Sequence, residues 1–253
     1  MKDNCFIPFS SNVSALIPDK LNDPFELNIP EICKIAANDL QEYLQTNQHK
    51  WIHNFGFCSE KTGPIKGKMF GVLVVENLNR EIGYLCTFSG KLEDEPHPDI
   101  FVPSLFDISS NNYFISKGMT ELTEMGNQIK SMESDNKVLR KSEINNLREE
   151  RRVKSTSLQE ELFSYYQFLN RVGRVKSLSA IFKDYSNKKP AAGSGECAAP
   201  KLLQYAFNKQ MKPLAIAEFW YGKTTKSKDR IHGIYYPSCN DKCRPILGYM
   251  LSE

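Results

Sequence analysis

A β-hairpin in the first half of the chain places the strongest constraint on its fold. Met69 to Glu76 (MFGVLVVE) is a β-branched run, and Glu81 to Ser89 (EIGYLCTFS) is a second run of β-type composition. The residues 77–80 between them (NLNR) form a turn. Residues 70–75 are almost continuously apolar, which predicts a first strand covered on both faces of its sheet.

Helical and strand patterns on either side of the hairpin supply the remaining elements of the body. Glu31 to Thr46 has an apolar face at helical spacing. Near the end of the chain we expect a helix over Cys197 to Gln210, a strand over Leu214 to Tyr221, and a short helix that begins near Cys239 or Asn240. This order predicts an α/β (α+β) fold in which helices pack on a mixed sheet.

The segment from about Met119 to Asn170 differs in character from the rest, because it lacks proline and has apolar residues at helical spacing. A heptad-like seam comprises Leu122, Met125, Ile129, Met132 and Leu139. A second stripe comprises Ile144, Leu147, Leu158, Leu162, Tyr165 and Leu169. We expect one long helix or two in sequence. This arm either folds back on its own chain or pairs with a second copy in a homodimer.

These patterns divide the chain into four parts. Residues 1–117 form the first part of the α/β body, and residues 118–182 form a long helical, coiled-coil-like arm. Residues 183–194 (KDYSNKKPAAGS) have the composition of a flexible linker. Residues 195–253 form the second part of the body, so that the arm interrupts it.

The overall composition excludes several classes of protein. The chain has seven cysteines, an odd number, and no secretory signal, which argues against a disulfide framework and favours a reducing cytoplasm. No apolar stretch approaches the length of a membrane helix, so we expect no membrane partner. The formal net charge of +3 is small, and any argument for nucleic acid must rest on local patches.

Three of the cysteines suggest a metal site. Cys239 and Cys243 are four residues apart at an expected helix start, and Cys197 opens the preceding helix. Thiolates at adjoining helix starts suit zinc, and His232 in the intervening loop is a candidate fourth ligand. The alternative is that the three cysteines are small buried residues.

The same layout resembles the zinc-dependent nucleobase deaminase fold. In that fold a hairpin leads to a helix start with one zinc ligand and a catalytic glutamate, followed by a strand and a helix start with two cysteines. The matching motifs here are residues 195–198 (GECA) and 237–243 (PSCNDKC). Two features depart from the family: Glu196 precedes Cys197, with Ala199 where the glutamate belongs, and three residues rather than two separate Cys239 from Cys243. The resemblance therefore supports a fold more than an activity.

Two basic patches suggest contact with RNA. The first patch lies in the arm and comprises Arg140, Lys141, Arg148, Arg151, Arg152 and Lys154. The second patch follows the aromatic pair Trp220 and Tyr221 and comprises Lys223, Lys226, Lys228 and Arg230. Cations neutralise phosphates, and aromatic rings beside them suit stacked bases. For the arm, the alternative is a solvated helix face with internal ion pairs.

A wider resemblance connects the chain to a known family. The strings 195–205 (GECAAPKLLQY), 212–222 (KPLAIAEFWYG) and 232–251 (HGIYYPSCNDKCRPILGYML) resemble the amino-terminal extension of RluA-type RNA pseudouridine synthases of Bacteroidetes. Weaker matches reach back to about residue 50. The resemblance implies a multi-domain enzyme that converts uridine to pseudouridine in tRNA or rRNA.

No catalytic residue carries over from that family, whose catalytic aspartate lies in an Arg-Leu-Asp motif that this sequence lacks. The chain ends about where the resemblance places the start of the catalytic domain, so we expect it to be inactive alone. Its expected partners are RNA and its own C-terminal catalytic domain, and its expected role is RNA binding or substrate positioning. Two alternatives stay open: a zinc-dependent deaminase-like domain fused to the synthase, and a structural or dimerisation module.

Overall fold

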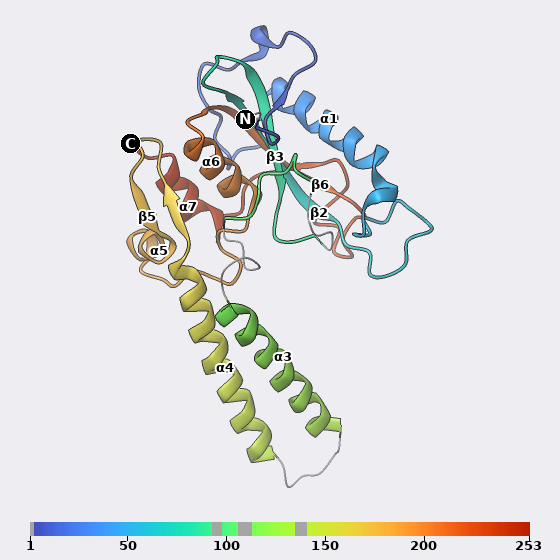
Figure 1. Cartoon of the computed structure of the whole chain (residues 1–253), viewed down its shortest axis with the longest axis vertical. Coiled ribbons are helices and arrows are strands. Elements are labelled where there is room, and N and C mark those ends of the chain that lie inside the picture. The colour runs from blue at the N-terminus through green and yellow to red at the C-terminus, as the bar shows by residue number, and fades with distance from the viewer. Residues whose placement is uncertain (1–2, 93–97, 106–112, 135–140) are drawn as a thin grey trace.

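The computed structural model describes residues 3–92, 98–105, 113–134 and 141–253. A five-stranded sheet forms the centre of the body, and a long helical hairpin extends away from it (Figure 1). The strand order is β1-β3-β2-β6-β7, with antiparallel pairing throughout and an isolated parallel bridge between Cys86 and Phe101. The strands are β1 (Ile7–Pro8), β2 (Lys68–Glu76), β3 (Ile82–Phe88), β6 (Lys212–Tyr221) and β7 (Tyr235–Tyr236). The α/β fold class predicted from the sequence is confirmed, but the described strands form an antiparallel sheet where a mixed sheet was expected.

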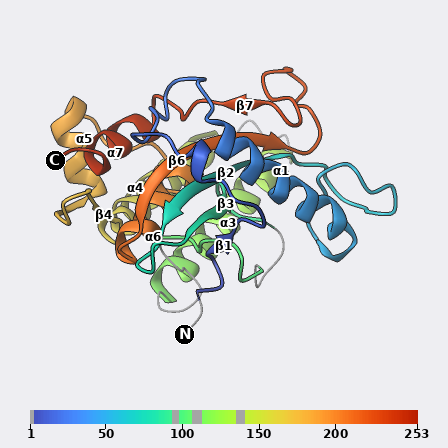
Figure 2. The same ribbon diagram turned by 90° about the horizontal axis from the view of Figure 1, so that it is seen from above.

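The central strand β2 is covered on both faces, as its apolar run predicts. On one face Val72 and Val74 pack with α1 (Glu31–Thr46). On the other face Leu73 and Val75 pack with α6 (Ala198–Asn208) and α7 (Cys243–Met250). Successive side chains of a strand point to opposite faces, so one strand contributes to both cores. Figure 2 shows the same arrangement from above.

The arm is a hairpin of two helices, α3 (Tyr113–Ser134) and α4 (Lys141–Ser164). Ile115 and Leu122 of α3 pack against Leu158 of α4 in a small core of their own. The helices approach closely at Gly118, where an added Cβ would lie 2.7 Å from a methyl carbon of Leu158. Of the predicted seam, Leu122 packs within the chain, Ile129 is buried and Leu139 lies outside the described residues, so a homodimer through the arm stays a prediction.

The chain leaves the arm earlier than the helical stripe predicts. Tyr165 and Leu169 were expected to continue the helix, but α4 ends at Ser164 and a small hairpin follows, formed by β4 (Gln167–Leu169) and β5 (Val175–Ser177). The reason is tertiary, since Tyr166 and Phe168 are buried in the core beneath α6.

The expected linker is partly helical. Helix α5 (Leu178–Ser186) includes the first four residues of the segment 183–194, and its C-cap Asn187 adopts a left-handed conformation. Ile181 and Phe182 anchor this helix in the body. Short 3-10 turns at Ser14–Leu16 and Gln48–Lys50 complete the described elements. Among those elements, no helix has both the length and the apolar character needed to cross a bilayer.

Candidate metal centre

The three cysteines singled out in the sequence meet at one point of the structure. Cys197 is the N-cap of α6, Cys243 is the first residue of α7, and Cys239 lies in the turn before α7. Their three sulfur atoms lie within 4.8 Å of one another, and the Sγ atoms of Cys239 and Cys243 are 3.5 Å apart. Cys243 is buried and Cys239 is exposed, so the cluster reaches from the core to the surface of the body.

The predicted start of the last helix is wrong by several residues. Helix α7 begins at Cys243, with Pro245 in its first turn, whereas Cys239 precedes it. The amide of Arg244 donates to the carbonyl of Cys239 at 3.2 Å, which closes the intervening turn. The two sulfurs therefore meet through a turn, not across one helical face.

A glycine lets the start of α6 approach the sheet. Gly71 lies opposite Glu218 in the pairing of β2 with β6. An added Cβ at Gly71 would lie 2.9 Å from the Cβ of Ala198 and 3.6 Å from the Cγ of Glu218. Because Gly71 has no side chain, the start of α6 with Cys197 can lie next to the Glu218 side chain.

Glu218 is a buried carboxylate beside the cluster, only 7% exposed. It accepts hydrogen bonds from the amide of Ala199 at 3.3 Å and from the hydroxyl of Ser238 at 2.6 Å. Burial raises the pKa of the Glu218 carboxyl, and the hydrogen bond from Ser238 opposes that shift. An acidic residue in an apolar strand needs such partners, and a backbone amide and a hydroxyl provide them here.

The three cysteines of the cluster differ in the direction of their pKa shifts. Hydrogen bonds from Cys197 and then Cys243 hold the pKa of Cys239 far below its ordinary value. A hydrogen bond with Cys197, followed by the one with Cys239, raises the pKa of Cys243, and the hydrogen bond with Cys239 is the largest cause of the raised pKa of Cys197. Three sulfur atoms this close to one another suit a divalent cation, which binds cysteine as the thiolate.

The spacing of the sulfurs fits zinc. A tetrahedral zinc with Zn–S bonds of about 2.3 Å holds its sulfurs about 3.8 Å apart. The separation of 3.5 Å between Cys239 and Cys243, and the 4.8 Å limit for the whole group, bracket that value. Three sulfur ligands leave a fourth position for another ligand.

Two charged residues flank the cluster at the start of α6. Glu196 accepts a hydrogen bond from the hydroxyl of Tyr166. It is the glutamate of the GECA motif that was compared with the deaminase glutamate. Lys201 is 1% exposed, with its ammonium 5.0 Å from the centre of the Phe88 ring, and burial lowers its pKa to about 8. Sequence reasoning missed Lys201, Ser238 and Gly71. Lys201 and Ser238 are close to Cys197 and Cys239 in the sequence but form no metal-site pattern, and only the fold brings Gly71 to the start of α6.

His232 lies outside the group of sulfurs. Its Nδ1 accepts from the amide of Gly222 at 3.4 Å, and its ring packs against Phe57 and Tyr221. Burial lowers its pKa. Within the part of the chain that the structure describes, the metal-ligating group consists of the three cysteines alone.

Most of the basic residues of the arm contact partners within the arm. Arg148 pairs with Glu133 at 2.5 Å, Arg152 pairs with Glu149 at 2.5 Å, and Lys154 pairs with Glu121. Arg151 donates to the carbonyl of Leu122 at 3.1 Å. Lys141 is the exposed first residue of α4, and Arg140 lies outside the described residues. The arm therefore balances much of its own charge.

The second basic patch forms an exposed loop after β6. Lys223, Lys226 and Lys228 are exposed, and the guanidinium of Arg230 lies 4.5 Å from the centre of the Tyr236 ring. Asp229 ties the loop together by accepting from Thr225 and Ser227. We call residues 222–231 the basic loop; its lysines project from a closed turn.

Comparison of the chain with protein-family models, with curated proteins and with solved structures finds no match. The site is therefore interpreted from its own geometry and from the sequence resemblance.

Proposed function

We propose that this chain is a zinc-binding, RNA-contacting region of an RNA pseudouridine synthase, without a catalytic residue of its own. The observation that carries the proposal is a convergence in space. The three strings that most resemble the synthase extension supply Cys197, Glu218 and the Cys239–Cys243 pair, which together form the candidate metal centre. The last two strings also flank the basic loop.

In this proposal zinc joins elements that are distant in sequence. Cys197 belongs to α6, whereas Cys239 and Cys243 belong to the turn and start of α7. A metal bound by all three stabilises the folded state, because the unfolded chain has no preformed site. The role of zinc here is structural: it holds the body that presents the basic loop.

The basic loop is the better candidate for RNA contact than the arm. Its lysines are exposed and its Arg230 lies over the ring of Tyr236, whereas the arm cations Arg148 and Arg152 pair with arm glutamates. Exposed cations gain affinity for RNA by releasing counterions from phosphates. The arm contributes mainly shape, because its exposed cations Arg148 and Arg152 are paired with glutamates.

Metal analysis tests the zinc site. Elemental analysis of the purified chain is expected to find about one zinc per chain, because three convergent thiolates bind zinc tightly at neutral pH. Cys239→Ser is expected to remove most of the metal. Cys58→Ser, which changes a cysteine outside the cluster, is the matched control and should retain it. A parent chain without metal would overturn the zinc proposal.

An RNA-binding assay tests the loop. The chain is expected to bind tRNA or rRNA fragments with an affinity that falls with salt. Lys226→Gln with Lys228→Gln should weaken binding and reduce the salt dependence by about one phosphate contact per lysine. The control Lys50→Gln removes an exposed charge elsewhere. Charge reversal at Arg148, Arg151 and Arg152 tests the arm, and unchanged binding there would remove the arm from the proposal.

A second candidate function is zinc-dependent hydrolysis in a deaminase-like domain. The observation that favours it is Glu218, a buried carboxylate beside the sulfurs and therefore in a place suited to a general acid or base. Glu218 and Ser238 line a cavity of only about 10 Å³, far below the size of a small-molecule site, which favours the structural role over the hydrolytic one.

A further inference from the structure

The largest described cavity lies away from the metal centre, at the opposite end of β6 from the basic loop. It has a volume of about 790 Å³, within the range of small-molecule sites. Its lining begins at Lys212 and Pro213, the first residues of β6, whereas the basic loop follows the last residue, Tyr221. A ten-residue strand separates the two places by about 30 Å.

The charged residues that line this cavity are all cations. Lys20, Arg171 and Lys212 line it, and none of the twelve described lining residues is acidic. The acidic residues Asp23 and Glu26 line the neighbouring cavity. A concave surface whose charged residues are all cations concentrates anions and suits phosphate oxygens.

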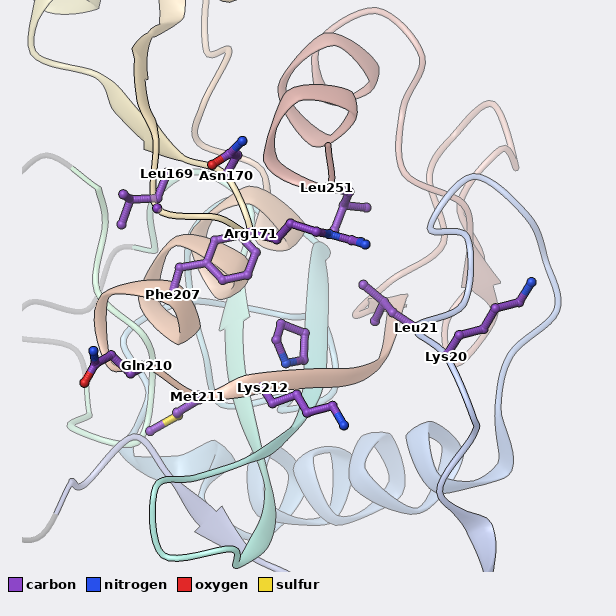
Figure 3. Close-up of a pocket in the computed structure, with 12 residues that line it drawn as sticks. Lys20, Leu21, Leu169, Asn170, Arg171, Phe207, Gln210, Met211, Lys212 and Leu251 are labelled. Atoms are coloured by element: carbon purple, nitrogen blue, oxygen red, sulfur yellow. The ribbon is translucent and has the colours of Figure 1, made fainter. Parts of the chain in front are cut away.

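Its floor is apolar. Phe207 near the end of α6, Met211, Leu21 and Leu251 contribute carbon surface between the cations. Figure 3 shows the Phe207 ring next to the Arg171 side chain, with Lys212 across the cavity and Leu21 near Leu251. An aromatic ring beside a guanidinium provides a stacking surface for a nucleobase.

The cations are held in place by ordered backbone. The amide of Arg171 donates to the carbonyl of Met250 at 2.9 Å, which ties the β4–β5 turn to α7. The buried side chain of Asn170 accepts from the amides of Val172 and Arg174 within that turn. Such a turn presents the arginine with little further ordering on binding.

The segment that carries Lys20 is fixed as well. The Asn22 side chain donates to the carbonyl of Ile216 at 3.0 Å and accepts from its amide at 2.9 Å. This pair replaces a strand partner along β6 and holds Lys20 and Leu21 beside the cavity. Three separate segments thus bring one cation each to a preformed site.

We propose that this cavity, built from Arg171, Lys212, Lys20 and Phe207, binds a nucleotide, with its phosphate at the cations and its base on Phe207. The occupant is either a free nucleotide or a nucleotide unit of an RNA strand, since both offer the same phosphate and base. The site does not depend on the proposed metal centre or on the basic loop.

Calorimetric titration of the purified 253-residue chain with uridine 5′-monophosphate tests the proposal. The monophosphate is expected to bind at least about tenfold more tightly than uridine, because the phosphate meets three cations. Arg171→Gln with Lys212→Gln should weaken its binding about tenfold or more, since both charge-assisted contacts are lost. Phe207→Leu keeps the apolar packing but loses the stacking face, and should weaken binding several-fold.

The control Lys50→Gln should bind like the parent, and circular dichroism checks that each variant is folded. A short single-stranded RNA identifies the source of the nucleotide: loss of RNA binding in the Arg171 and Lys212 variant assigns the site to a strand, and loss of monophosphate binding alone assigns it to a free nucleotide. Absent monophosphate binding, or binding that neither variant changes, would overturn the proposal. Equal binding of poly-glutamate would overturn nucleotide recognition in favour of an acidic peptide. Failure of the basic-loop variants to affect RNA would count against the proposed function and leave this site standing.

Discussion

Glu218 shows how much depends on a single residue of this fold. It lies on β6 opposite Gly71, and its two carboxylate oxygens satisfy one amide of α6 and one hydroxyl before α7. The missing side chain at Gly71 makes the room, and the carboxylate links the two segments that carry the cysteines. The apolar neighbours Ala217 and Phe219 mark the residue in the sequence, but they do not identify its partners.

Substitution of Glu218 is expected to separate its structural from its chemical role. Glu218→Leu leaves the Ala199 amide and the Ser238 hydroxyl without their acceptor, at a cost of about 1–3 kcal/mol for each buried group. Glu218→Gln keeps one acceptor oxygen and should lose less. Denaturant unfolding measures both changes, and equal stability of all three proteins would contradict the assigned hydrogen bonds.

The same variants decide between the two candidate functions. If the zinc-loaded parent released ammonia from a nucleobase and Glu218→Gln abolished this release while zinc remained bound, the hydrolytic role would replace the structural one. We expect no release.

At the level of elements, the α3–α4 hairpin is a nearly separate unit. Its small core of Ile115, Leu122 and Leu158 is distinct from the two cores of the body. Leu122 is 7% exposed, so a charge there cannot remain hydrated without opening the hairpin.

Leu122→Asp is expected to destabilise the hairpin by about 3 kcal/mol and to lower the helix content of the chain, as measured by circular dichroism. Glu124→Lys, an exposed change on the same helix, is the control and should leave the helix content unchanged. Zinc binding should persist in both variants, because the cysteines belong to the body. Sedimentation of the same variants tests the predicted homodimer, which the Leu122 change would dissociate.

Element boundaries were predicted well where local pattern and tertiary packing agree. The helix over Glu31–Thr46 and the strands of the β2–β3 hairpin lie where their periodicity places them. The pattern failed at Tyr165 to Leu169, whose spacing fits a helix although Tyr166 and Phe168 are buried as part of an extended segment. It failed again at Cys239, where a turn replaces the first residues of the expected helix.

For the whole molecule, the described sites occupy different ends of one body. The candidate metal centre lies where the starts of α6 and α7 meet, and the basic loop follows the nearby end of β6. The cationic cavity lies at the other end of that strand (Figure 3). The hairpin arm extends away from the body (Figure 1). This separation lets metal, RNA and nucleotide binding be tested by independent variants.

By itself, the sequence determined the class of the fold, the doubly covered strand, the helical arm and the three cysteines of the metal centre. These features depend on period, composition and spacing, which are local properties of the chain. Only the tertiary structure decided that the arm folds on itself, that Glu218 and Gly71 lie beside the cysteines, and that His232 lies apart from them. It alone brought Lys20, Arg171 and Lys212 to one cavity. Contacts between residues so distant in sequence follow from the packing of helices on the sheet, and no local pattern encodes them.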